Sequence, residues 1–181
     1  DPPSAPPLPR PPPPPLPPRL RHAPLPPPPP SPSAHPSSVP LCNRQYINHV
    51  QCTAAESIGV EGRGGYYQEA GALRDMIQNH LLSILTMVAM DDPTRFTAEN
   101  LRNEKMTVLN SIAVPDATAA AKAVAVGQYD GYHAEPGVPA DSLTPTFAAV
   151  RLEVDNRRWH GVPFYLRSGK RLPKRVTDIA I

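Results

Sequence analysis

The sequence has 181 residues, 28 prolines and a formal net charge of +2, and 21 of the prolines lie within residues 1–40. A segment so rich in proline and so poor in large apolar side chains cannot bury enough surface to fold, so residues 1–42 are predicted to be a disordered, proline-rich tail. The net charge comes from this tail. A balanced remainder without interleaved basic and aromatic residues argues against a nucleic-acid-binding protein.

No apolar run approaches the roughly 20 residues of a membrane span, and Cys42 and Cys52 have neither disulfide-framework nor metal-ligand spacing. We therefore expect a cytoplasmic protein without a membrane segment or a metal site. The chain begins at Asp1 and stops at Ile181 inside an apolar alternation, so it is expected to be a fragment.

The chain after the tail is predicted to open with a strand over residues 45–56, and glycines then break it between residues 59 and 65. A helix is predicted from about Gln68 to Met90, because apolar side chains recur there at helical spacing. This stripe consists of Leu73, Met76, Ile77, Leu81, Ile84, Leu85 and Val88. A second helix is predicted to begin at Thr97, a favourable N-cap, and to stop before Pro115.

The remainder is predicted to consist mostly of strands. Residues 119–128 are rich in alanine and lack a clear period, although AVAVGQY fits a short strand, and residues 130–145 read as a loop. Apolar and polar side chains alternate in TFAAVRLEVDN, and VPFYLRSG and VTDIAI follow as further strands. Helices before an antiparallel sheet predict an α+β fold, with the helices packed on one face and the sheet incomplete.

His80 falls within the apolar stripe of the first predicted helix, where a titratable group needs a partner or a chemical role. On pattern alone, a core histidine bonded to a backbone carbonyl is the commoner interpretation. Asp75 lies five residues earlier, and in an α-helix its side chain would point about 140° around the axis from His80. The two groups would then border one cleft without sharing one helix face.

Several segments together resemble glucose-6-phosphate dehydrogenase over roughly residues 43–181. They are NRQYINHVQ, EGRGGYYQEAGALRDMIQNHLL, VGQY and TFAAVRLEVDNRRWHGVPFYLRSGKRL. The resemblance implies that residues 43–181 are the first part of the C-terminal, substrate-binding domain of that family. It also implies a homo-oligomeric oxidoreductase of the pentose phosphate pathway, which oxidises glucose 6-phosphate to 6-phosphogluconolactone with NADP.

The same resemblance assigns roles to five residues. His80 matches the general base, Glu56 and Asp75 match carboxylates that accept hydrogen bonds from sugar hydroxyls, and Lys170 and Arg175 match basic substrate contacts. Without the resemblance, Glu56 would be read as an ordinary solvated strand end, and Lys170 as part of a solvated basic turn. Asp75 would be read as an acid near the helix start that the helix dipole stabilises. Lys174 replaces Arg175 if the register is off by one, and Arg167 matches a residue that binds a second dinucleotide in some members.

The chain has no G-x-G-x-x-G turn between a strand and a helix, and the family's RIDHYLGKE segment is absent. No cofactor-binding residue is therefore predicted in this chain, and NADP is expected to need a domain outside it. We accordingly expect negligible turnover by this polypeptide alone.

Two other functions remain open at this point. Pro14, Pro17 and Arg19 fit P-x-x-P-x-R, a pattern that SH3 domains bind on a polyproline helix, although dense proline tracts produce such matches by chance. The chain also fits a truncated, non-catalytic subunit partner.

Overall fold

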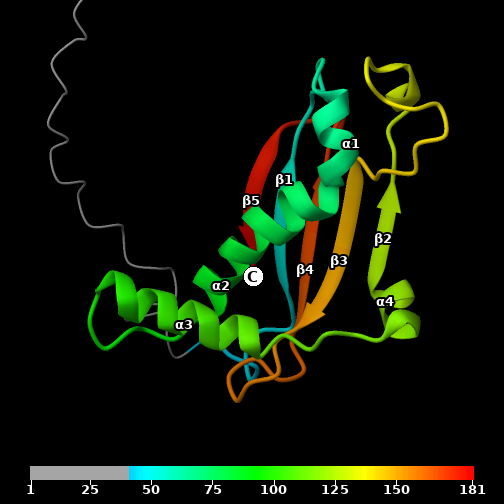
Figure 1. Ribbon diagram of the computed structural model, residues 1–181. Helices are drawn as coiled ribbons and strands as arrows, with labels where there is room; N and C mark the ends of the chain where they lie inside the picture. Colours follow the sequence, from blue (N-terminus) through cyan, green and yellow to red (C-terminus); the bar gives the residue numbers. More distant parts are fainter. Residues whose placement is uncertain (1–40) are drawn as a thin grey trace, which may run out of the picture.

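Five strands form one mixed sheet in the computed structural model, which describes residues 41–181 (Figure 1). They are β1 Val50–Ala55, β2 Val124–Gly127, β3 Phe147–Glu153, β4 Pro163–Gly169 and β5 Val176–Ala180, in the order β2-β3-β4-β1-β5. The last three confirm the predicted strands. β1 is shorter than predicted, because the residues after Asn43 form a turn in which its carbonyl accepts from the Ile47 amide. Residues 1–40 of the predicted tail, with the motif at Pro14, Pro17 and Arg19, lie outside the described residues.

The sheet is built around one parallel pair. β1 and β4 run parallel from Val50↔Phe164 to Ala55↔Gly169, while β1–β5, β2–β3 and β3–β4 are antiparallel. A parallel pair requires a long connection, and here the helices and two strands supply it. The predicted α+β class is confirmed, with helices crossing one face of the sheet (Figure 1), and the parallel pair makes the sheet mixed rather than wholly antiparallel.

The helices are α1 Gly64–Ala72, η2 Leu73–Leu81, α2 Leu82–Ala89, α3 Ala98–Asn110, α4 Ala117–Ala123 and the short 3₁₀ turn η3 Tyr132–Ala134. Thr97 is confirmed as the N-cap of α3, since its side chain accepts a 3.2 Å hydrogen bond from the Asn100 amide. Asp116 caps α4 in the same way through the Ala119 amide, at 2.8 Å. The short strand suggested by AVAVGQY is confirmed as β2.

The first predicted helix is interrupted rather than continuous. Gly71 has φ 60° and ψ 175°, a conformation that glycine adopts without the steric cost of a side chain. The Ala72 amide consequently donates to the Pro145 carbonyl at 2.8 Å, and the helix resumes as η2, which is a π-helix. The sequence between Gly64 and Ala89 therefore folds as three helical segments.

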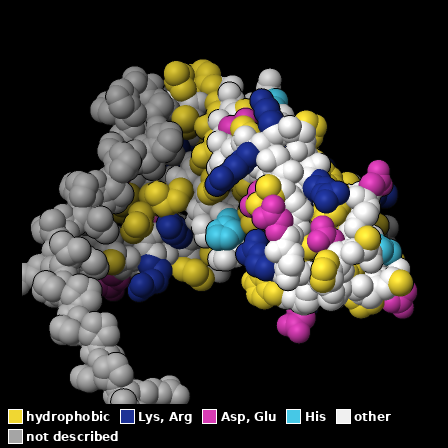
Figure 2. Space-filling view, turned by 90° about the horizontal axis from the view of Figure 1, so that it is seen from above, with side chains coloured by type: hydrophobic (Ala, Val, Ile, Leu, Met, Phe, Trp, Pro, Cys, Tyr) yellow, Lys and Arg dark blue, Asp and Glu magenta, His cyan; other side chains and the backbone are white. Residues whose placement is uncertain are grey.

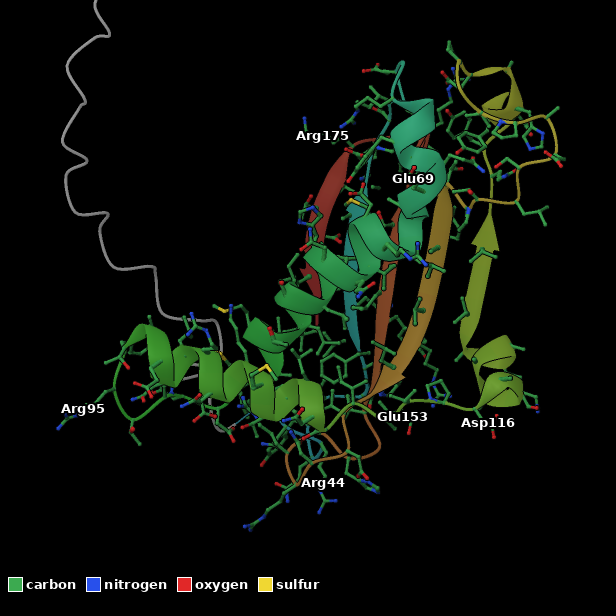
Figure 3. The ribbon with its side chains drawn as sticks, viewed as in Figure 1. Arg44, Glu69, Arg95, Asp116, Glu153 and Arg175 are labelled. Atoms are coloured by element: carbon green, nitrogen blue, oxygen red, sulfur yellow. The ribbon has the colours of Figure 1, made fainter. Side chains whose placement is uncertain are left out.

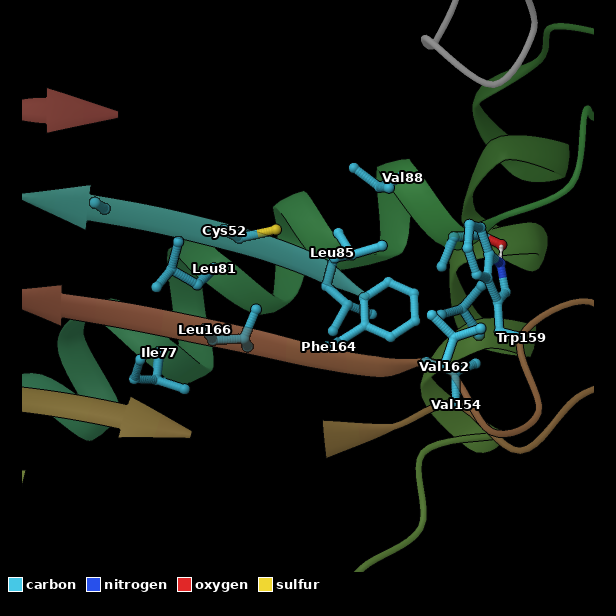
Figure 4. Close-up of a cluster of buried hydrophobic side chains, with 14 of the residues drawn as sticks. Cys52, Ile77, Leu81, Leu85, Val88, Val154, Trp159, Val162, Phe164 and Leu166 are labelled. Atoms are coloured by element: carbon cyan, nitrogen blue, oxygen red, sulfur yellow. Dashed lines mark hydrogen bonds between the residues drawn. The ribbon is translucent and has the colours of Figure 1, made fainter. Parts of the chain in front are cut away.

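The main core lies between these helices and the sheet (Figure 4). The helical stripe supplies Ile77, Leu81, Leu85 and Val88, which pack with Cys52, Phe164 and Leu166 of the sheet and with Trp159. Trp159 also donates its indole N–H to the Ala89 carbonyl at 2.9 Å. Each such large apolar side chain stabilises the fold by about 1.5–3 kcal/mol when fully buried.

A second, smaller aromatic cluster lies where α1 begins. Val60, Tyr67 and Tyr132 are buried there, and Tyr129 and Val138 pack against them. A Cβ atom on Gly64 would lie 2.3 Å from the Pro136 carbonyl oxygen, so only glycine allows α1 to approach this loop so closely. The cluster thereby joins the start of α1 to the loop between β2 and β3.

Candidate active site

β1 and β4 end side by side, and the chain beyond them stays paired. The Glu56 amide donates to the Gly169 carbonyl at 3.0 Å, and the Leu172 amide donates to the Glu56 carbonyl at 2.9 Å. The Lys170 amide donates to the Thr146 carbonyl at 3.0 Å, which ties it to the start of β3. Two residues that lie far apart in the sequence, Glu56 and Lys170, are thus fixed next to each other.

Glu56 and Lys170 form an ion pair at this end of the sheet. Lys170 Nζ lies 2.5 Å from Glu56 Oε2, and the side chains are 5% and 32% exposed, respectively. Lys170 Nζ also lies 5.2 Å from the centroid of the Tyr67 ring. An ammonium and a carboxylate are therefore held together against an aromatic wall, with the carboxylate on the solvent side.

The charge of Asp75, in η2, acts on the same tyrosine that lies beside the ion pair. Burial raises the pKa of Tyr67 well above its usual range, and the charges of Asp75 and Glu56 both add to this rise. Asp75 is half-buried and lines a hollow of about 420 Å³ between α1 and η2, together with Tyr66, Arg74 and other helix residues. Neither Glu56 nor Lys170 lines that hollow, so Asp75 and the ion pair approach Tyr67 separately.

His80 is exposed, which corrects its predicted place in the apolar stripe and rules out a buried core histidine. The reason is the winding of η2, in which hydrogen bonds close five residues apart instead of four. Residues five apart, such as Asp75 and His80, consequently follow one another along one side of the helix. The predicted separation of about 140° holds only for an α-helix and is wrong here.

The remaining predicted basic residues, Arg175 and its alternative Lys174, lie beyond the end of the sheet. Arg175 directly precedes β5, so it lies one position beyond the last β1–β5 pair, Ala55↔Val176. It is exposed, and Figure 3 shows it at the end of the sheet where Glu69 of α1 also lies. Lys174, the alternative to Arg175, is exposed as well.

Arg167 lies on the opposite face of the sheet. Its guanidinium donates to Thr53 Oγ1 at 3.5 Å, and both residues line a groove of about 460 Å³ that the end of α4 also lines. None of the five predicted site residues lines this groove. Arg167 therefore lies apart from the ion pair and from Asp75.

The surface over the candidate site is electrostatically mixed. Figure 2 looks onto this end of the molecule and shows basic, acidic and histidine side chains interspersed. Within residues 41–181, no three His, Cys, Asp or Glu side chains gather in a way that would hold a metal ion. None of the helices in this range has the length and apolar character needed to cross a bilayer.

Sequence reasoning misses Tyr67, whose ring lies against Lys170 and whose pKa is raised by the charges of Glu56 and Asp75. A tyrosine pair at the start of an amphipathic helix is read as ordinary core or surface, and nothing local distinguishes Tyr67 from its neighbour. The structure separates them, because Tyr66 is exposed whereas Tyr67 is 3% exposed.

Comparison with known proteins places this arrangement in a family. A family model described as the C-terminal domain of glucose-6-phosphate dehydrogenase matches residues 37–181. The chain belongs to the glucose-6-phosphate dehydrogenase family. All five predicted site residues, Glu56, Asp75, His80, Lys170 and Arg175, lie within the matched range.

Individual relatives agree with this assignment. Glucose-6-phosphate 1-dehydrogenase of Aggregatibacter actinomycetemcomitans is 48% identical over 152 residues, which cover 78% of this chain and 31% of the relative. The crystal structure of glucose-6-phosphate 1-dehydrogenase from Mycobacterium avium superposes with a TM-score of 0.76 at 42% identity, covering 81% of this chain and 32% of that one. This chain therefore spans about a third of the length of these relatives.

A further structure is that of a glucose-6-phosphate dehydrogenase in complex with its substrate glucose 6-phosphate. It superposes with a TM-score of 0.71 at 38% identity and covers 78% of this chain and 30% of that one. The fold described for residues 41–181 is thus the fold of part of an enzyme that binds this sugar phosphate.

Proposed function

We propose that this chain supplies the sugar-binding half of a glucose-6-phosphate dehydrogenase active site. The observation that carries the proposal is the contact between Lys170 and Glu56 beside Tyr67, with the charge of Asp75 reaching the same ring. A sugar hydroxyl both donates and accepts hydrogen bonds. A carboxylate next to an ammonium therefore complements one hydroxyl from both sides, and Asp75 offers an acceptor for another.

His80 is proposed to act as the general base. Oxidation at C1 of glucose 6-phosphate requires a group that accepts the hydroxyl proton as hydride leaves the same carbon. The imidazole is suited to this near neutral pH, and the exposure of His80 allows a ligand to reach it. Asp75 lies on the same side of η2, so both can face one sugar, while Lys170 and Arg175 supply positive charge for its oxygen atoms.

The described residues do not fit the NADP that the resemblance implies. A pyrophosphate binds at a helix N-terminus that glycine residues leave open. Here the Pro136 carbonyl oxygen would lie only 2.3 Å from a Cβ of Gly64, so a loop residue packs closely against the start of α1. We derive no hydride-transfer step through residues 41–181 and expect this polypeptide to bind the sugar phosphate without appreciable turnover.

Further expectations from the sequence and from the resemblance also stay predictions. These are the division into a proline-rich tail at residues 1–42 and a partial C-terminal domain at residues 43–181, association into homo-oligomers, and a cytoplasmic location. No comparison supports the SH3-ligand alternative.

The experiment is an isothermal titration calorimetry measurement in which glucose 6-phosphate is added to the 181-residue chain. Glucose and inorganic phosphate serve as separate ligands to divide the affinity between sugar and phosphate. Lys170→Met is expected to weaken binding of glucose 6-phosphate roughly tenfold or more, because it removes a charged hydrogen-bond donor. Lys122→Met, at an exposed lysine of α4, is the matched control and should bind like the parent chain. Equal affinities in the two variants would disprove the proposed site.

A further inference from the structure

Lys170 is held by its surroundings on two sides. Its side chain is 5% exposed, with Glu56 Oε2 at 2.5 Å on one side and the ring of Tyr67 at 5.2 Å on the other. A lysine ammonium within about 6 Å of an aromatic centroid is attracted by the negative face of the ring, and the attraction is strongest where water is excluded. Glu56 by itself fixes only one side of a flexible side chain.

The Tyr67 ring is in turn fixed by other aromatic side chains. It is 3% exposed and meets Tyr132 edge to face, with the centroids 6.4 Å apart. Tyr132 meets Tyr129 in the same manner at 5.6 Å, and its hydroxyl donates to Gln68 Oε1 at 3.1 Å. These contacts leave the Tyr67 ring little freedom to rotate away from the ammonium.

The ring, rather than the hydroxyl, is the part of Tyr67 that contacts Lys170. Within residues 41–181, the Tyr67 hydroxyl forms no hydrogen bond, and burial raises its pKa further above neutrality. The side chain is therefore a neutral aromatic surface throughout the physiological range. A lysine is a point charge on a long flexible stem, and such a surface restricts where that charge lies.

We propose that Tyr67 is a positioning residue, whose ring holds the Lys170 ammonium beside Glu56 in the orientation that meets the ligand. The effect on glucose 6-phosphate rests on the proposed function, whereas the holding of Lys170 by the ring does not. Tyr67 acts through Lys170 and needs no contact with the ligand.

The first test observes Lys170 directly in the full chain, without ligand. The lysines are Lys105, Lys122, Lys170 and Lys174, so labelling with ¹³C-lysine gives few ε-methylene NMR signals, and Lys170→Arg assigns the one in question. The ring current of Tyr67 should displace the Lys170 signal upfield of the other lysines. A parent chain in which the signal is not displaced would overturn the proposal before any variant of Tyr67 has to fold.

The second test compares variants at Tyr67. Tyr67→Met keeps an apolar filler but removes the ring, so the Lys170 signal should move to the position of the other lysines, and the affinity for glucose 6-phosphate should fall about tenfold. Tyr67→Phe should restore both the signal and most of the affinity. Tyr165→Met, on the open face of the sheet, is the matched control. The Trp159 indole signal, from a buried donor to Ala89, verifies folding.

The outcomes separate the two proposals. If Tyr67→Met folds and keeps the displaced signal, the holding of Lys170 by the ring is wrong. If the signal moves while the parent chain binds glucose 6-phosphate and the variant binds it equally well, the effect of that holding on the ligand is wrong. If the displacement is lost in Tyr67→Met and retained in Tyr67→Phe, the positioning of Lys170 is supported, even when the parent chain does not bind glucose 6-phosphate. Failure of the parent chain to bind glucose 6-phosphate would overturn only the proposed function.

Discussion

Lys170 and Glu56 are in contact at 2.5 Å, yet Lys170 is 5% exposed whereas Glu56 is 32% exposed. The pair is therefore asymmetric, with an ammonium that has lost nearly all of its contact with water and a carboxylate that has kept some. An unpaired buried charge costs far more free energy than an unpaired solvated one. Removing the carboxylate should therefore lower the free energy of unfolding by more than is usual for a partly exposed side chain.

We predict that Glu56→Gln lowers the free energy of unfolding by about 2 kcal/mol, because Lys170 is left buried without a counter-charge. Urea unfolding followed by Trp159 fluorescence measures this change. Glu69→Gln, at an exposed glutamate of α1, should alter the free energy by less than about 0.5 kcal/mol. Glu56→Gln combined with Lys170→Met should recover part of the loss, and a double variant weaker than both single ones would argue against the pair.

Gly71→Ala should destabilise the fold by about 1–2 kcal/mol. Gly71 has a positive φ, and an added Cβ would lie 3.1 Å from Thr144 Cγ2. Gly65→Ala is the matched control, because a Cβ there meets nothing within 4 Å and alanine favours the helix. The same urea experiment compares the two. A Gly71→Ala chain as stable as Gly65→Ala would show that the break in the helix does not depend on glycine.

Thr97→Ala should lower the free energy of unfolding by about 1 kcal/mol, since the Asn100 amide loses its capping oxygen. Thr107→Ala provides the contrast within α3, because its hydroxyl donates only to the Asn103 carbonyl inside the helix. Replacing that threonine by alanine should be neutral or slightly stabilising on helix propensity. Thermal unfolding monitored by circular dichroism ranks the three chains, and equal midpoints would refute the cap.

Alkaline pH should destabilise the fold partly through Cys52. Burial, with a smaller contribution from the Asp178 carboxylate, raises the pKa of the Cys52 thiol from 9.0 to about 11. The unfolded chain then loses this proton at a lower pH than the folded chain. The contribution to stability is therefore complete below pH 9 and is lost between about pH 9 and 11, by an amount on the order of 2 kcal/mol.

Urea unfolding at a series of pH values between 8 and about 11.5 tests this expectation. Cys52→Ala should show a shallower decline than the parent chain, whereas Cys42→Ala should follow the parent, because Cys42 is only half-buried. The buried tyrosines also have raised pKa values and contribute to the decline in every chain, so the comparison between the variants carries the result. Parallel curves for the parent and Cys52→Ala would contradict the prediction.

Elements with a local chemical signal are predictable from the sequence. Thr97 has the side chain of an N-cap in the right place, and the alternation in residues 147–153 marks a strand with one buried face. Asp116 is an equally suitable N-cap, but no helix is predicted after it, because the alanines that follow form no apolar stripe. The parallel pairing of β1 with β4 and the break at Gly71 depend on partners far along the chain, so no local pattern reveals them.

Some residues of the candidate site can likewise be predicted from the sequence, and others cannot. Glu56 and Lys170 are predicted only through the family resemblance, and their contact follows from the common end of β1 and β4. A period of 3.6 residues places His80 in the apolar stripe, whereas the π-helical hydrogen bonds of η2 turn it outward. This winding is a property of the tertiary structure. Tyr67 has no signal at all in the sequence, because its importance lies in what packs around it.

Helix α1 is fastened along its length to the loop that precedes β3. Gly64 abuts the Pro136 carbonyl, Gln68 accepts from Tyr132 and Ser142, and Ala72 donates to the Pro145 carbonyl. The same loop is therefore part of what places the Tyr67 ring behind Lys170. A substitution in the loop can disturb the ion pair without touching either of its partners.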